Sequence, residues 1–185
     1  AVRSGARVYW VCPLIEESEH LESEAAEPTA AALAEALPEV RVGLIHGRMS
    51  PAEKEKVMKA FAQGKVQLLV ATTVIEVGVD VPAATLMIIE NAERLGLSQL
   101  HQLRGRVGRG RDASTCVLLY RSPLAAMAKA RLEVLRGTND GFEVAQRDLE
   151  LRGPGEVLGT RQTGLMQLRV ADLVRDADLM PSVRA

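Results

Sequence analysis

The sequence has few aromatic residues, few cysteines and almost no net charge. Aromatic side chains make up 3% of its 185 residues, so a buried core has to be built from alanine, valine, leucine and isoleucine. Cys12 and Cys116 have no CxxC partner, which argues against a zinc site and indicates two reduced core thiols. The formal net charge of −1 excludes a wholly basic nucleic-acid binder, although it leaves room for a local basic face.

The sequence also has no long apolar run. No stretch approaches the roughly 18 apolar residues of a membrane-spanning helix, and no signal peptide is recognisable at the amino end. We therefore expect a soluble, cytoplasmic chain without a membrane partner. Because the sequence begins at Ala1 rather than at methionine, we also expect it to be part of a longer protein.

Five short apolar segments predict the strands of one sheet. They lack alternation of polar and apolar residues, and helical segments separate them, which is typical of a parallel sheet covered by helices on both faces. In such an α/β fold, functional loops follow the carboxyl ends of the strands, here near residues 13, 46, 71 and 90. The predicted strands are 7–13, 40–47, 66–72, 84–90 and 114–120.

The segments between these strands predict three helices. An acidic stretch at 16–27 indicates a solvated loop that leads into an alanine-rich helix at about 28–37. A capping-box pattern at 50–53 begins the second helix, which ends at Gly64. The third helix is expected over 98–109, with its first residue, a serine, as the N-cap.

From Ser122 onward the pattern changes to two helices and a glycine-rich stretch. The first helix, "SPLAAMAKARLEVLR", stops at Gly137, and "GFEVAQRDLEL" predicts the second. Four glycines and a proline among the thirteen residues 152–164 indicate a structured loop. We therefore expect an α/β domain at 1–121 and a helical appendage at 122–185.

The stretch "HQLRGRVGRGRD" at 101–112 places glycines beside arginines in a predicted helix. On one helical face, Gln102, Arg106 and Arg109 would form a receptor for a phosphate group. Gly105 and Gly108 would each cost about 1 kcal/mol inside a helix, which indicates that another surface approaches there. The alternative is an exposed basic helix that only makes ion pairs. The order of the glycines does not fit a dinucleotide-binding fingerprint.

These residues resemble a known family. "QLRGRVGR" at 102–109 resembles motif VI of superfamily-two helicases, and "VATTVIEVGVDVP" at 70–82 resembles motif V. The resemblance implies a RecA-like parallel sheet with helices on both faces. It also implies that Arg106 and Arg109 reach ATP bound mainly by another motor domain and stabilise the transferring phosphoryl group. Gln102 would link the nucleotide to the DNA side.

The same resemblance implies further contacts. Gly78 would permit close backbone approach, and Asp80 would contact the nucleotide ribose or orient the arginines. "HGRMSPAEKEKVMKAF" at 46–61 resembles a segment that contacts the DNA backbone. Alternatives are a solvated aspartate in a strand–turn–strand and a purely structural histidine at 46. The implied DNA-binding residues are Thr72, Thr73, His46, Gly47 and Arg48.

The tail narrows the resemblance to the RecG family. "NDGFEVAQRDLELRGPGEVLGTRQTG" at 139–164 resembles the translocation (TRG) segment of that family, and "PLIEESE" at 13–19 resembles it too. A helical hairpin followed by this loop would couple ATP-driven movement to DNA, although a structural C-terminal cap is an alternative. The implied coupling residues are Arg131, Arg152, Arg161 and Gln162. The family implies an ATP-dependent helicase that remodels branched double-stranded DNA, such as stalled forks and Holliday junctions, in recombination and repair.

Two motifs of an ATP hydrolase are lacking. The sequence contains no G-x-x-x-x-G-K-[ST] loop and no D-E-x-H or D-E-x-D box. ATP with Mg²⁺ would therefore be held mostly by a first motor domain in the amino-terminal part of a longer parent protein, and this chain alone is predicted to be inactive. Two alternatives remain. One is the motor half of a transcription-repair coupling factor, which shares the "RGPGEVLG" pattern. The other is a non-catalytic DNA-binding or interaction module, against which Arg106 and Arg109 argue.

Overall fold

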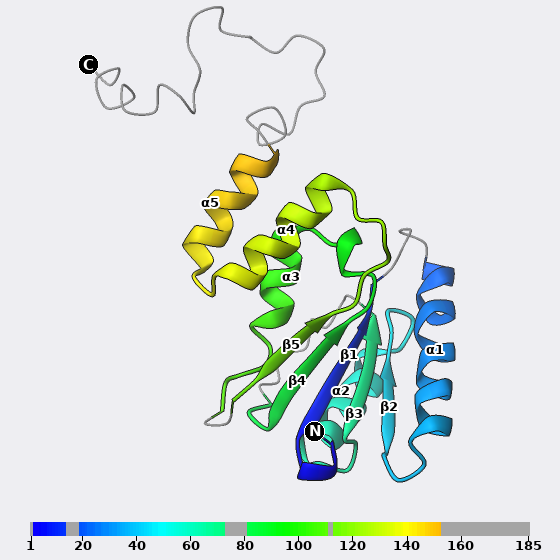
Figure 1. The fold of residues 1–185 in the computed structure, drawn as a ribbon. Helices are drawn as coiled ribbons and strands as arrows, with labels where there is room; N and C mark the ends of the chain where they lie inside the picture. Colours follow the sequence, from blue (N-terminus) through cyan, green and yellow to red (C-terminus); the bar gives the residue numbers. More distant parts are fainter. Residues whose placement is uncertain (1, 14–18, 73–80, 111–112, 153–185) are drawn as a thin grey trace, which may run out of the picture.

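The described strands form one parallel sheet. A computed structural model of the chain describes residues 2–13, 19–72, 81–110 and 113–152. Within them, five strands pair in the order β2-β3-β1-β4-β5, and every neighbouring pair is parallel (Figure 1). This arrangement confirms the predicted α/β fold. The strands are β1 (Arg7–Cys12), β2 (Val42–Ile45), β3 (Leu68–Thr72), β4 (Ala84–Ile89) and β5 (Thr115–Leu118).

The first strand of the chain lies at the centre of the sheet. β1 is flanked by β3 and β4, so that Tyr9 pairs with Leu69 on one side and with Met87 on the other. All three side chains are buried. A strand with a neighbour on each side and helices above and below has no solvated face, which explains why its sequence shows no alternation.

Helices cover both faces of the sheet (Figure 1). α1 packs Ala26 and Leu33 on one face, whereas α2 and α3 bring Phe61 and Leu100 to the other face. The ring of Phe61 lies 4.8 Å from the ring of Tyr9, measured between centroids, so an aromatic contact ties α2 to the central strand. The helices are α1 (Glu19–Ala36), α2 (Pro51–Ala62), α3 (Leu97–Arg104), α4 (Ala126–Gly137) and α5 (Gly141–Arg152).

The predicted capping box of α2 is confirmed. The Ser50 hydroxyl accepts a hydrogen bond from the Glu53 backbone N–H at 3.3 Å, and the Glu53 carboxylate accepts from the Ser50 N–H at 2.8 Å. The Ser50 hydroxyl also donates to the Glu53 carboxylate at 2.7 Å, and this bond, together with the one from the Ser50 backbone N–H, lowers the pKa of Glu53. Gly64 follows the helix at φ +75°, a left-handed conformation that glycine adopts without strain.

Two predicted helix starts are wrong. α1 begins at Glu19, so most of the acidic stretch predicted as a loop is helical, because glutamate and alanine are strong helix formers. α3 begins at Leu97 with Gly96 as its N-cap. The Gln99 side chain accepts from the Gly96 N–H at 3.0 Å, and this bond takes the place of the predicted serine cap.

α4 and α5 form a hairpin that packs on α3. Leu132, Leu135 and Val144 of the hairpin belong to the same buried cluster as the α2–α3 side of the sheet. The two predicted helices are therefore present, although α4 begins at Ala126, later than predicted. The predicted glycine-rich loop lies outside the described residues. Within the described part of the chain, no helix combines the length and the apolar character needed to cross a membrane.

Candidate functional site

The segment with the two candidate arginines is a turn, not a helix. α3 ends at Arg104, so the prediction of a helix over 98–109 is wrong. Gly105 is the C-cap residue, and its N–H donates to the His101 carbonyl at 3.0 Å. The Arg106 N–H then donates to the Leu103 carbonyl at 2.9 Å, a bond over three residues that tightens the end of the helix.

Two glycines, Gly108 and Gly110, determine the path of this turn, each for a different reason. Gly108 has φ +81°, and a Cβ atom there would collide with the Ser114 side chain. A Cβ atom on Gly110 would lie 2.6 Å from the Pro82 carbonyl oxygen. Gly108 is therefore required by the direction of the chain, and Gly110 by the close approach of a second backbone segment.

The approach to Pro82 brings together the two segments that resemble helicase motifs. Pro82 ends the 70–82 segment and precedes β4, so the arginine turn, defined here as residues 105–110, lies beside the amino end of β4. Thr73, Gly78 and Asp80 lie outside the described residues, so the predicted contacts of these three residues stay predictions.

The predicted shared face of Gln102, Arg106 and Arg109 is wrong, because the helix carries only Gln102. Gln102 is exposed on α3. Arg109 is exposed, and its Nε donates to the Gly105 carbonyl at 3.0 Å. Arg106 is partly exposed. The tight turn therefore carries both guanidinium groups, and the helix positions them only through its end.

The candidate DNA-binding residues lie at the opposite edge of the sheet. Thr72 ends β3 and His46 follows β2, so both are at the carboxyl ends of the strands. The Thr72 side chain is only 1% exposed. Its hydroxyl cannot contact DNA in this conformation, which corrects the predicted side-chain contact.

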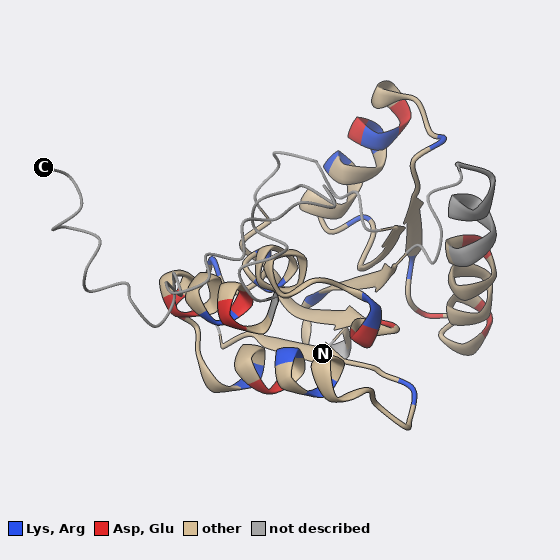
Figure 2. Cartoon of the chain, turned by 90° about the horizontal axis from the view of Figure 1, so that it is seen from above, with Lys and Arg blue, Asp and Glu red and all other residues tan. Residues whose placement is uncertain are grey.

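Of the other candidates at this edge, His46 is the least accessible. Its side chain is 15% exposed, and its Nε2 lies 3.9 Å from the Glu27 carboxylate. A carboxylate at this distance disfavours a phosphate group beside the imidazole. In the cartoon of Figure 2 the described part of α1 has segments coloured for acidic residues and none coloured for lysine or arginine. Gly47 and Arg48 are exposed in the turn before α2, so this turn is the accessible part of the predicted DNA contact.

The predicted coupling residue Arg131 attaches the hairpin to the sheet. Its Nη2 donates to the Glu93 carbonyl at 3.0 Å. Glu93 lies in η2 (Ala92–Arg94), the 3-10 turn after β4. Arg161, Gln162 and the side chain of Arg152 lie outside the described residues, so a contact between Arg131 and the glycine-rich loop stays a prediction.

One well-placed residue was missed by sequence reasoning. The Nη1 of Arg104 donates to the Leu135 carbonyl at 2.6 Å and to the Thr138 carbonyl at 2.7 Å. These carbonyls lie at the carboxyl end of α4, more than thirty residues after Arg104 in the sequence. The sequence gives no signal for this contact, because it depends on how α3 and α4 pack.

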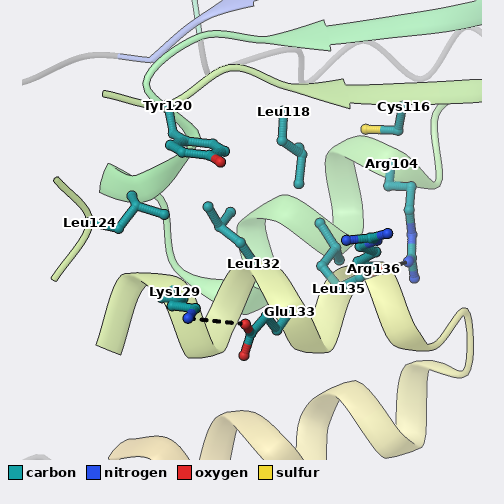
Figure 3. A pocket seen from close by; sticks show the side chains of 10 residues that line it. All are labelled: Arg104, Cys116, Leu118, Tyr120, Leu124, Lys129, Leu132, Glu133, Leu135 and Arg136. Carbon is teal, nitrogen blue, oxygen red and sulfur yellow. Dashed lines mark hydrogen bonds and ion pairs between the residues drawn. The ribbon is translucent and has the colours of Figure 1, made fainter. Parts of the chain in front are cut away.

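A cavity of about 480 Å³ lies between β5 and α4 (Figure 3). Leu118 and Tyr120 line it from the strand side, Leu132 lines it from α4, and Arg104 and Arg136 lie at one end. Burial raises the pKa of the Cys116 thiol on its wall to about 11, an effect that the positive charge of Arg104 opposes.

Two known protein families match most of the chain. Residues 1–111 match the helicase conserved C-terminal domain family. Residues 138–185 match a family described as ATP-dependent DNA helicase RecG, domain 3, C-terminal. Residues 112–137, which include β5 and α4, lie between the two matches.

Individual relatives agree with these matches. The chain is 66% identical over 183 residues to ATP-dependent DNA helicase RecG of Escherichia coli (strain K12), covering 99% of this chain and 26% of the relative. It is 46% identical over 184 residues to the protein of the same name from Bacillus subtilis (strain 168), covering 99% of this chain and 27% of the relative. A solved structure described as RecG bound to a three-way DNA junction matches with TM-score 0.72 and 45% identity, covering 97% of this chain and 22% of that one. The chain thus spans about a quarter of the length of these relatives.

Proposed function

Because the chain belongs to the helicase conserved C-terminal domain family, we propose that it is the second motor domain and translocation segment of a longer ATP-driven DNA translocase. The parent protein would remodel branched DNA, such as stalled forks and Holliday junctions, during recombination and repair. The observation that carries the proposal is the arginine turn packed against the end of the 70–82 segment. This contact joins the two helicase-like segments at one edge of the sheet.

Within this proposal, the arginine turn is the nucleotide-facing part of the chain. ATP with Mg²⁺, held mainly by the first motor domain of the parent, would supply the phosphoryl transfer. Arg106 and Arg109 would present planar, permanently charged donors to its phosphates, a chemistry that suits guanidinium groups. Asp80 and Gly78 would complete the nucleotide contact, and Gln102 would link it to the DNA side. The left-handed Gly108 supports this role, because it fixes the chain between the two arginines.

DNA would be contacted at the other edge of the sheet. The exposed Gly47 and Arg48 support a phosphate contact there, and the N–H groups at the start of α2 would add further donors. Such contacts position the protein on DNA without reading its sequence. Branched DNA is the proposed substrate because the solved RecG relative is described as bound to a three-way junction.

The division of labour within the chain is also part of the proposal. Residues 1–121 would be the motor domain, and residues 122–185 the hairpin with its translocation segment. Arg131, Arg152, Arg161 and Gln162 would transmit movement between the two. The cytoplasm is the proposed compartment, since a reducing environment suits the unpaired thiols of Cys12 and Cys116.

The deciding experiment measures fork-stimulated ATP hydrolysis by the full-length parent, comparing wild type with Arg109→Ala. We expect kcat to fall about a thousandfold or more, the scale of an arginine finger, while fork binding is retained. Arg136→Ala is the matched control, because Arg136 is an exposed arginine on α4, outside the arginine turn. Hydrolysis that is unchanged in Arg109→Ala would overturn the assignment of the arginine turn to the nucleotide.

A further inference from the structure

Arg104 closes the carboxyl end of α4. The last carbonyls of a helix lack partners within the helix and carry partial negative charge. The Nη1 of Arg104 donates to two carbonyls of this end, those of Leu135 and Thr138, at 2.6 and 2.7 Å. Figure 3 shows the Arg104 side chain beside Leu135 at one end of the cavity. A charged donor from α3 therefore holds the point where the hairpin turns.

Thr138 lies in the turn between α4 and α5, so the hydrogen bond from Arg104 to its carbonyl restrains both helices of the hairpin. The Thr138 hydroxyl accepts from the Asp140 N–H at 3.1 Å. The Asp140 carboxylate accepts from the Phe142 N–H at 2.8 Å, and its carbonyl accepts from the Val144 N–H at 3.0 Å. This is the hydrogen-bond pattern of an aspartate N-cap. The turn between α4 and α5 is thus held by its own hydrogen bonds.

His101 strengthens the contact from the side of α3. Its Nδ1 lies 3.0 Å from the Nη2 of Arg104, where the neutral ring can accept a hydrogen bond. Its Nε2 lies so close to α5 that a Cβ atom on Gly141 would be only 3.1 Å away. One turn of α3 therefore places two side chains at the hairpin turn: the Arg104 guanidinium donates to carbonyls at its start, and the His101 imidazole lies next to Gly141 at its end.

Arg104 is also the last residue of α3, and the arginine turn begins directly after it. We propose that Arg104 is a positioning residue that couples the arginine turn to the hairpin, so that movement of one shifts the other. This inference rests on the proposed function, and it adds to Arg131 a second attachment of the hairpin. Arg131 holds the hairpin to η2, after the carboxyl end of β4, whereas Arg104 holds it to the helix that leads into the arginine turn.

The inference predicts a loss of coupling rather than a loss of hydrolysis. In the full-length parent, Arg104→Met keeps the length of the side chain but removes its donors. We expect the number of forks unwound per ATP hydrolysed to fall about tenfold, the scale on which one charge-assisted hydrogen bond shifts an equilibrium. Fork-stimulated kcat should stay within about threefold of wild type, because Arg106 and Arg109 keep their own charges.

Two further variants separate positioning from stability. Arg104→Lys keeps the positive charge and an N–H donor but loses the forked geometry of the guanidinium group. We therefore expect the number of forks unwound per ATP hydrolysed to be higher in Arg104→Lys than in Arg104→Met, although still below wild type. If Arg104→Met fails to fold, Arg104→Lys can still be used to test the inference. Arg136→Ala removes an exposed arginine from the same end of the cavity and should leave the ratio unchanged.

The outcomes distinguish this inference from the proposed function. If hydrolysis and unwinding fall by the same factor in both Arg104 variants, Arg104 only supports the fold and the inference is overturned, while the proposed function stands. A wild-type parent without fork-stimulated hydrolysis would overturn the proposed function and the inference together. The coupling role would be supported by three results together. The number of forks unwound per ATP hydrolysed would fall in Arg104→Met, would partly recover in Arg104→Lys, and would stay at the wild-type value in Arg136→Ala.

Discussion

Gly108 sets the path of the chain between the two candidate phosphate-binding arginines. Its φ of +81° is left-handed, and its missing side chain leaves room for Ser114, which directly precedes β5. Either property alone would disfavour another residue, and here both act at one position. A single glycine thus fixes the backbone from which the Arg109 side chain extends, although it carries no chemistry of its own.

We expect Gly108→Ala to destabilise the isolated chain by about 1–2 kcal/mol, the cost of a left-handed conformation for a residue with a Cβ atom, with a further cost from the Ser114 contact. Thermal unfolding followed by circular dichroism measures this change. Gly137→Ala is the control, because no atom lies within 4 Å of a Cβ there. Equal stability of the two variants would contradict the conformational role of Gly108.

The buried thiol of Cys12 makes stability depend on pH in the alkaline range. Burial, followed by the negative charge of Glu90, raises the pKa of Cys12 from 9.0 to about 12. The unfolded chain therefore loses this proton at a lower pH than the folded chain does. The resulting stabilisation is fully present below about pH 9 and is lost as the pH rises toward about 12.

The free energy of unfolding, measured by urea titration at several alkaline pH values, should accordingly fall more steeply with pH in wild type than in Cys12→Ala. Comparing slopes removes the contribution of lysines and tyrosines, which titrate in both proteins. Parallel slopes for the two proteins would show that the Cys12 thiol ionises equally easily in the folded and unfolded states.

At the scale of single elements, two serines in similar sequence contexts have different roles. Ser50 accepts from the Glu53 N–H at the start of α2, whereas Ser98 lies inside α3, one residue after its start. We expect Ser50→Ala to cost about 1 kcal/mol of stability, the usual value of an N-cap, and Ser98→Ala to cost close to nothing. Chemical denaturation of both variants tests this. A larger loss in Ser98→Ala would mean that the hydroxyl at 98 caps the helix after all.

The strands of this fold could be predicted from the sequence, whereas the ends of α3 could not. The five strands were predictable, because central parallel strands must be apolar on both faces. The ends of α3 were not, since its N-cap uses a glycine and a glutamine side chain, a less common pairing than serine with glutamate. At the other end, a glycine that ends a helix and a glycine that interrupts one look alike in sequence, so Gly105 was placed in the helix interior.

At the scale of the whole molecule, the candidate site is spread over two edges of the sheet. The arginine turn lies at the amino end of β4, and the exposed turn with Gly47 and Arg48 lies at the carboxyl end of β2. The types of residue were predictable from the motifs. Their arrangement was not, because the opposite edges and the contact of Arg104 with α4 arise only when the helices pack.

If the proposed function is right, this chain carries only part of the nucleotide site, and this has a direct consequence for activity. The sequence contains no P-loop pattern, so the chain alone should hydrolyse ATP at a rate indistinguishable from buffer, with or without forked DNA. A phosphate-release assay measures this rate, with the full-length parent as the positive control. Fork-stimulated turnover by the chain alone would require an additional phosphate-binding loop that the proposed function does not include.

The central position of β1 also bears on how the chain folds as it is synthesised. β1 ends at Cys12, but its neighbour β3 is complete only at Thr72 and its other neighbour β4 only at Ile89. At a synthesis rate of about 5–20 residues per second, the middle strand waits roughly 3 to 12 seconds for its first neighbour. During this time its apolar side chains have no sheet to join. The strand on which the rest of the sheet is later assembled is therefore the one that stays longest without its neighbours, with its apolar side chains open to wrong contacts.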